Sequence, residues 1–320
     1  MIVDSHVRLI KLDRSFLFDL FRFALYFFHC AFGYYYMKGL HRNGKEAPVK
    51  NLKRLIVPVL FWIVIYTLLN IYNEVLSGNM SMMDFLKHQC IALFISGTGF
   101  HLWFMASLMI YVVLAGFLYL NGQLKKLYPA SIVLYLIGLL GSYYDFIGNR
   151  IPLLSAFFSS YYFTTWCRLF LHGLPMFTMG LYIAQNDQKL MQIDHGMLCI
   201  SCAALAALSF AEIYLVVRYA DNRTNICSLF LCLFTFPFFI LLLKNPLQEQ
   251  SGIARALKYI STFMYYSHPL FRTVLASAFM RLFGFDLSDL LMSIVVVILC
   301  TVFGYALYRL NNRYLNKICS

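Results

Sequence analysis

The long apolar runs of this sequence restrict its fold more than any other feature. Of its 320 residues, 61% are hydrophobic and 12% are charged, whereas a soluble domain is about half apolar and about a quarter charged. A helix needs about 20 mostly apolar residues to cross the hydrocarbon core of a membrane. The sequence therefore predicts an all-α, polytopic transmembrane bundle of about nine spans, at residues 16–37, 55–74, 101–120, 128–147, 168–185, 196–217, 225–243, 259–281 and 288–310.

A tenth apolar run, 84–97, is shorter and follows the polar segment SGNMSMMD. We expect it to lie at the membrane interface or to re-enter the membrane rather than to span it. The loops in this reading are too short to form a soluble domain. We therefore predict a single membrane-embedded domain over residues 1–320, with an outward polar tail at 1–15 and a basic cytoplasmic loop at 38–54.

Lys and Arg residues are distributed unevenly between alternate loops, with about twice as many on one side as on the other. The positive-inside rule places the richer side in the cytoplasm. This predicts a cytoplasmic C-terminus and an N-terminus outside. The formal net charge of +12 is then explained by basic loops at the membrane surface rather than by binding of nucleic acid.

The nine cysteines are scattered, mostly within apolar runs, and they form no CxxC pair. Disulfide frameworks and zinc sites have regular cysteine spacing. We therefore interpret the cysteines as buried thiols and expect no metal site.

Ionisable residues inside the spans are the clearest functional signal. Such groups are costly in hydrocarbon and normally face a protein interior or a wet cavity. Three spans carry an arginine and a histidine on one helix face, and His101 stands at the outer mouth of another. We expect these groups to line one polar chamber that opens away from the cytoplasm. Alternatively, each arginine reaches to the headgroups and each histidine bonds a neighbouring helix. The pairs are Arg22 with His29, Arg168 with His172, and His268 with Arg272.

The segment 38–54, KGLHRNGKEAPVKNLKR, is strongly basic and leads directly into the apolar run that begins LIVPVLFW. Topology alone explains this charge in one interpretation. In the other, the segment forms an anion site for a phosphate-bearing donor, with Lys53 and Arg54 nearest the membrane and Lys50 beside them.

Five segments of the chain contain motifs that occur together, in this order, in one family. They are RFALYFFHCAFGYYY (22–36), NLKRLIVPVLFW (51–62), FHLWFMASLMIYVV (100–113), RLFLHGLPMFTMGLYIA (168–184) and YISTFMYYSHPLF (259–271). The set resembles the acyltransferase-3 family of multi-pass membrane acyltransferases. The His-Leu-Trp-Phe start of the third segment, which is followed by a tyrosine, is the strongest match.

The chain also departs from the family pattern. The first family helix carries an arginine and then a histidine that is thought to help catalysis, and nothing before residue 16 can form it. We therefore expect this chain to lack that helix. Arg22 has a family counterpart. His29 stands where the family has an apolar residue, so it is a candidate to replace the lost base.

The resemblance implies a bacterial inner-membrane enzyme that transfers an acyl group, usually acetyl, from cytoplasmic acyl-CoA to a carbohydrate hydroxyl at the outer face. Its partners would be the lipid bilayer and the carbohydrate acceptor. The base would be His101 or His268, because imidazole suits proton transfer at neutral pH. Stabilising cations would be Arg168, Arg272 or Arg22, and the donor phosphates would bind Arg54, Lys53 and Lys50. There are two alternatives. One is a transporter or flippase of a lipid-linked or small polar substrate, and the other is a non-catalytic fragment of the acyltransferase fold.

Overall fold

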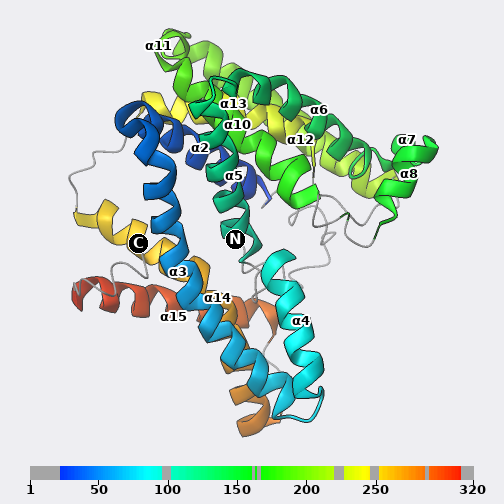
Figure 1. Cartoon of the computed structure of the whole chain (residues 1–320), viewed down its shortest axis with the longest axis vertical. Helices are drawn as coiled ribbons and strands as arrows, with labels where there is room; N and C mark the ends of the chain where they lie inside the picture. The colour runs from blue at the N-terminus through cyan, green and yellow to red at the C-terminus, as the bar shows by residue number, and fades with distance from the viewer. Residues whose placement is uncertain are drawn as a thin grey trace. The chain divides into compact units, whose positions relative to one another are not determined.

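The computed structural model describes residues 22–95, 102–160, 163, 167–219, 227–245, 252–284 and 288–310. Every regular element within these residues is helical (Figure 1). The longer helices are α2 (Phe23–Asn43), α3 (Ala47–Asn70), α4 (Met82–Ile95), α5 (Trp103–Leu120), α6 (Leu127–Leu140), α10 (Leu174–Gln185), α12 (His195–Tyr219), α13 (Leu229–Lys244), α14 (Gly252–Phe283) and α15 (Asp289–Leu310). Short elements are η2 (Gly44–Glu46), η3 (Ile71–Val75), η4 (Leu124–Lys126), α7 (Asp145–Gly148), α8 (Pro152–Phe158), η5 (Cys167–Gly173) and α11 (Asp187–Leu190).

The described residues divide into two compact units. Unit 1 comprises residues 53–95, 102–106, 252–284 and 288–310, and unit 2 comprises residues 22–52, 107–160, 163, 167–219 and 227–245. Helices α3 and α5 each contribute residues to both units.

Small residues bring α2 and α10 of unit 2 into backbone contact. A Cβ atom added to Gly33 would overlap the carbonyl oxygen of Phe177, and one added to Gly180 would overlap that of Cys30. Glycine at such contacts lets membrane helices approach closely. Because η5 leads directly into α10, this contact also places η5 beside α2.

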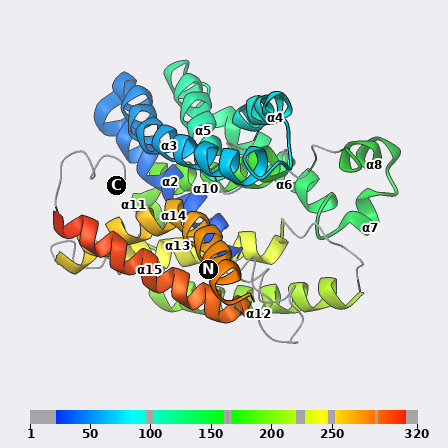
Figure 2. The same ribbon diagram turned by 90° about the horizontal axis from the view of Figure 1, so that it is seen from below.

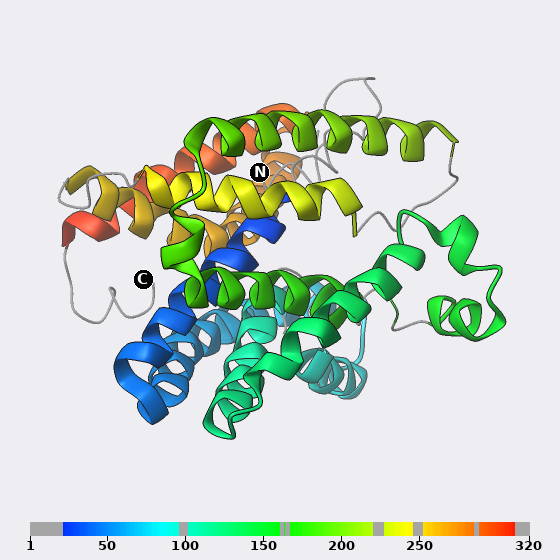
Figure 3. The same cartoon turned by 90° about the horizontal axis from the view of Figure 1, so that it is seen from above.

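A buried carboxylate in unit 2 joins α12 to the start of α13. The two helices run side by side (Figure 3). Glu212 accepts hydrogen bonds from the backbone N–H groups of Leu229 (2.9 Å) and Phe230 (3.1 Å) and from the hydroxyls of Tyr144 and Ser228. The N-terminus of a helix has unpaired N–H groups and positive partial charge, so it favours a carboxylate there.

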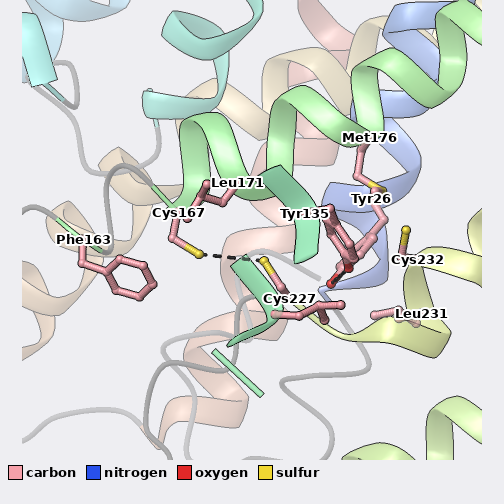
Figure 4. Packing of buried hydrophobic residues seen from close by; sticks show 10 residues of the cluster. Tyr26, Tyr135, Phe163, Cys167, Leu171, Met176, Cys227, Leu231 and Cys232 are labelled. Carbon is pink, nitrogen blue, oxygen red and sulfur yellow. Dashed lines mark hydrogen bonds between the residues drawn. The ribbon is translucent and has the colours of Figure 1, made fainter. Parts of the chain in front are cut away.

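A cluster of buried apolar and sulfur-containing side chains fills unit 2 next to this junction (Figure 4). The Tyr26 and Tyr135 phenol oxygens lie 3.2 Å apart, and the Tyr26 oxygen accepts a hydrogen bond of 2.7 Å from the Ser228 N–H. Tyr135 donates to the Ser228 carbonyl at 2.6 Å. The cluster therefore holds α2 and α6 against the segment that precedes α13.

In unit 1, α14 and α15 pack along each other (Figure 2). Helix α3 joins α14 through an aromatic contact, since Trp62 stacks on Tyr266 with ring centroids 5.8 Å apart. Tyr66 donates a hydrogen bond of 2.6 Å to the Tyr266 carbonyl.

The outer face of α3 is apolar. Leu60, Val64 and Leu68 are exposed and recur every four residues, whereas Trp62 and Tyr66 are buried. Residues four apart lie on one face of a helix. An exposed apolar stripe of this length is typical of a helix that faces lipid.

The all-α membrane bundle predicted from the sequence is confirmed. Four helical segments are long and apolar enough to cross a membrane, namely Phe23–Val75, Trp103–Leu120, His195–Val216 and Leu291–Leu310. The count of nine spans stays a prediction. Other expected spans have irregular helices here: the run 128–147 forms α6 and then turns after Leu140, and the run 168–185 is divided between η5 and α10.

The basic segment 38–54 differs from the loop that we expected. Helix α2 continues to Asn43, and α3 begins at Ala47. Only η2 separates them. Gly44 has a φ angle of +50°, a conformation that favours glycine and reverses the chain at this point.

Candidate active site

Two buried histidines face each other in unit 2. His29 of α2 is fully buried and His172 of η5 is 1% exposed. Their ring centroids lie 5.7 Å apart with an interplanar angle of 81°. The close contact between α2 and α10 brings them together, because His29 lies one turn before Gly33 and His172 lies two residues before the start of α10.

The hydrogen bonds of His29 define its tautomer. Its Nδ1 lies 2.7 Å from the carbonyl oxygen of Leu25. A carbonyl can only accept, so Nδ1 carries a proton, and in the neutral ring Nε2 is the basic atom. Nε2 lies 3.4 Å from the hydroxyl oxygen of Ser107, which is also fully buried. The backbone thus orients a basic nitrogen toward a hydroxyl.

His172 is held differently. Neither ring nitrogen has a hydrogen-bond partner within the part of the chain that the structure describes. Its ring meets the Tyr26 ring edge-on, with centroids 4.3 Å apart. Buried polar atoms are nearly always hydrogen-bonded, and exceptions frequently have a catalytic or binding role. His172 is therefore a candidate to contact a substrate.

The helix that carries His172 is irregular. Residues 167–173 form a π-helical segment, and such segments are rare and frequently occur at functional sites. Arg168 and His172 both lie in it. Pro175 lies at the start of α10 and has no N–H to donate.

Two arginines lie near each other, and one of them lies near His172. The Arg22 guanidinium is within electrostatic range of both Arg168 and His172, and one of its nitrogens is buried. Both arginine side chains are partly buried. Two like charges at this depth repel each other, so an anion or a developing negative charge between them would be strongly stabilised.

Tyr111 completes the cluster. Its hydroxyl donates to the carbonyl of Leu169, and its ring lies 5.9 Å from that of His29. Gly173 makes this approach possible: a Cβ there would overlap the Tyr111 hydroxyl and would lie 2.9 Å from His29 Nε2. Helices α2, α5 and η5 therefore converge on one small region.

This cluster lies within a sequence that matches a known family over nearly its whole length. The family model described as "Acyltransferase domain", of the acyltransferase-3 type, matches residues 2–309. The chain belongs to the acyltransferase-3 family. The resemblance deduced from the five ordered motifs is thus confirmed, and with it a membrane protein of the acyltransferase class.

The chain is also similar to part of a protein named amino-acid racemase from Enterococcus faecalis. They are 26% identical over 185 residues, which is 56% of this chain and 26% of the racemase. The chain therefore spans about a quarter of the length of that curated relative. No solved structure matches the chain.

The predicted polar residues of this acyltransferase-3 chain are divided between the two units. Arg22, His29, Arg168 and His172 gather in unit 2, whereas His268 and Arg272 belong to α14 in unit 1. His101 lies outside the described residues. The roles predicted for His101, His268 and Arg272 stay predictions.

His268 has a clear structural task. Pro269 lacks an N–H, so the carbonyl of Tyr265, four residues earlier, loses its normal helix partner. His268 Nδ1 donates to this carbonyl and to that of Met264, at 3.0 Å each. The histidine thus compensates the backbone break made by the proline that follows it.

The predicted donor-binding cations lie on the first turns of α3. Lys50, Lys53 and Arg54 are all exposed. Within unit 1, Lys258 of α14 lies in electrostatic range of Arg54. This adds a basic residue to the predicted group that the sequence pattern did not single out.

Several residues of the candidate site have no signal in the sequence. The sequence places His172 in the polar chamber with Arg168 but gives it no catalytic role, and it does not single out Ser107, Tyr111 or Tyr26 as site residues. A tyrosine or serine in a transmembrane run is too common to be a signal. Only the tertiary contacts show that these side chains meet the histidines.

Proposed function

We propose that this protein transfers an acyl group, most simply acetyl, from acyl-CoA to a hydroxyl of a cell-surface carbohydrate across a bacterial inner membrane. The observation that carries the proposal is the buried His29–His172 pair, with the Arg22 guanidinium in electrostatic range of His172, inside a chain of the acyltransferase-3 family. Acyl transfer to a hydroxyl needs a base and a group that stabilises the oxyanion.

His29 acts as the base in this proposal. Its Nδ1–H is bound to the Leu25 carbonyl, so the ring cannot rotate freely and Nε2 is directed at a hydroxyl. His172, whose nitrogens have no partner among the described residues, binds the incoming hydroxyl. Arg22 and Arg168 stabilise the negative charge that develops on the acyl oxygen.

The donor binds at the basic turns of α3. Exposed cations on these turns are Lys50, Lys53 and Arg54. Lysine and arginine side chains bind phosphates through charge-assisted hydrogen bonds. Acyl-CoA is the donor because its phosphates match this charge and its thioester is an activated acyl group.

Substitution of His29 tests the proposed function. Membranes that contain the full-length protein and its natural acceptors are given radiolabelled acetyl-CoA, and base-labile label is measured in the carbohydrate fraction. We expect His29→Gln to lower the transfer rate about 10²- to 10⁴-fold, the usual contribution of a general base. His195→Gln is the matched control, because His195 is exposed at the start of α12.

A folded His29→Gln protein that is as active as this control would refute the role of His29. Absence of transfer by the wild-type protein would refute the proposed function.

Substitution of Arg54 tests the donor site separately. Arg54→Ala removes one cation. We expect it to raise the apparent KM for acetyl-CoA at least about tenfold, with kcat little changed, because loss of a hydrogen bond to a charged group costs about 1.5–3 kcal/mol of binding free energy. Lys189→Ala removes another exposed cation, outside the basic segment. Equal KM values for the two variants would exclude Arg54 from the donor site.

A further inference from the structure

Ser107 has the surroundings of a nucleophile. Its hydroxyl is fully buried on α5, 3.4 Å from His29 Nε2. His29 is itself oriented by the Leu25 carbonyl at 2.7 Å. Covalent catalysis usually combines three groups: a hydroxyl, a base within or near hydrogen-bond distance of it, and a third group that orients the base. The distance between hydroxyl and base is often longer when no substrate is bound.

The hydroxyl proton of Ser107 is directed by its neighbours. In the neutral ring, His29 Nε2 has no proton to donate, so the Ser107 O–H is the donor in this pair. Tyr111 also interacts with the Ser107 side chain. Because the Tyr111 proton is used by the Leu169 carbonyl, its oxygen serves as an acceptor. The Ser107 hydroxyl has one proton, so donation to the Tyr111 oxygen competes with donation to His29 Nε2, and only the second arrangement prepares Ser107 for attack.

We infer that Ser107 carries the acyl group as a covalent ester between donor and acceptor, an inference that rests on the proposed acyl transfer. The Ser107 oxygen attacks the thioester carbon, the carbon–sulfur bond breaks, and His29 passes the serine proton to the departing CoA sulfur. The acceptor hydroxyl then attacks the ester, and His29 moves its proton to the Ser107 oxygen, which restores the free serine.

The same surroundings protect such an ester. Ser107, His29 and Tyr111 are each fully buried, and exclusion of water prevents hydrolysis of a reactive intermediate. Arg22 lies in electrostatic range of His172 and of Arg168, and in this mechanism the two guanidinium groups supply positive charge for the oxyanions of both half-reactions. A covalent carrier also lets the CoA leave before the acceptor arrives.

Labelling without acceptor tests the inference. The full-length protein, purified into lipid nanodiscs, is mixed with radiolabelled acetyl-CoA, and protein-bound label is located by peptide mass spectrometry. We expect up to one acetyl group per chain, on the peptide that contains Ser107, and release of a matching amount of CoA thiol. The oxygen ester should resist neutral hydroxylamine and be removed by alkali.

Three variants make the result specific. Ser107→Ala should lose both label and transfer, whereas Ser107→Cys should form a thioester that neutral hydroxylamine removes, a change in chemistry that no structural role would produce. Ser131→Ala is the matched control, since Ser131 is a buried serine of unit 2 that bonds Thr178 at 2.9 Å. His29→Gln should slow labelling about 10²- to 10⁴-fold.

The outcomes separate this inference from the proposed function. If wild-type protein transfers acetyl to carbohydrate but Ser107→Ala retains that transfer, transfer is direct and the inference is wrong while the function stands. Label found on another residue also overturns it. If Ser107→Ala does not fold, the hydroxylamine sensitivity of Ser107→Cys decides, and a resistant label in that variant refutes the serine carrier. If the wild-type protein transfers nothing, both the function and the inference are refuted.

Discussion

At the scale of single residues, His268 and Pro269 form a coupled pair. The proline removes the N–H that would bond the Tyr265 carbonyl, and His268 supplies a substitute donor at 3.0 Å. A buried carbonyl without a donor costs about 1–3 kcal/mol. His268 therefore has reason to be present even if it takes no part in catalysis.

A double-mutant cycle measures this coupling. His268→Ala alone should destabilise the protein by about 1–3 kcal/mol. In a Pro269→Ala background the new N–H bonds the Tyr265 carbonyl, so the same substitution should cost about 1 kcal/mol less. Chemical denaturation in detergent gives the four free energies. Equal costs in both backgrounds would show that the histidine does not compensate the proline.

Asp187 gives a prediction for pH dependence. It pairs with Lys38, and hydrogen bonding to that ammonium lowers the pKa of the Asp187 carboxyl in the folded protein. Because this pKa is lower in the folded protein, the ion pair stabilises the fold at pH values above the unfolded-state pKa of about 3.9. This contribution is lost as the pH falls through the pKa of Asp187 in the folded protein. The side chains of Lys38 and Asp187 are 42% and 24% exposed, so solvent limits the contribution to about 1 kcal/mol or less.

Asp187→Asn tests the sign. At neutral pH and low salt the variant should unfold at a slightly lower temperature than the wild-type protein. The difference should shrink as the pH is lowered below about 4, where the wild-type carboxyl also becomes neutral. A difference that grows on acidification would contradict the assignment.

At the scale of helices, the contact between α2 and α10 depends on two glycines. Gly33→Ala places a methyl group against the backbone carbonyl of Phe177, which must separate the helices. We expect a loss of about 1–3 kcal/mol, as for overpacked cores, and a loss of transfer because His29 and His172 move apart. Gly39→Ala, in the same helix, is the control.

That control distinguishes packing from helix propensity. A Cβ at Gly39 meets only the Asn51 amide nitrogen at 3.8 Å, an ordinary contact. Alanine is the better helix former by about 0.5–1 kcal/mol, so Gly39→Ala should be neutral or stabilising. Thermal unfolding of both variants provides the comparison, and equal stability of Gly33→Ala and Gly39→Ala would mean that α2 and α10 do not pack as described.

At the scale of the whole molecule, the topology is the main prediction. The apolar runs predict nine spans, and the distribution of Lys and Arg predicts an N-terminus outside and a cytoplasmic C-terminus. Reporter fusions at residues 3 and 318 test this directly. Cytoplasmic signals from both ends would show that the span count is wrong by one, with the run 84–97 as the first segment to re-examine. The structure has a helix there, α4, of 14 residues, which is short for a span.

The sequence by itself determined the class of fold and the family. Long apolar runs have few alternatives to helices in a membrane, because every backbone polar group must be paired within the segment. The five ordered motifs were sufficient to recognise the acyltransferase-3 family. Spacing also predicted that Arg22 with His29, and Arg168 with His172, share helix faces.

Only the tertiary structure decided which faces meet. Periodicity along one helix contains no information about its neighbour. The structure shows that two of the three predicted Arg/His pairs meet in unit 2, and that His268 bonds a backbone carbonyl. Whether the third pair joins them stays a prediction. The π-helical turn at Cys167–Gly173 and the glycine contact between α2 and α10 arise from packing. They bring His29 and His172 together, and the missing side chain at Gly173 leaves room for Tyr111 of α5 beside them.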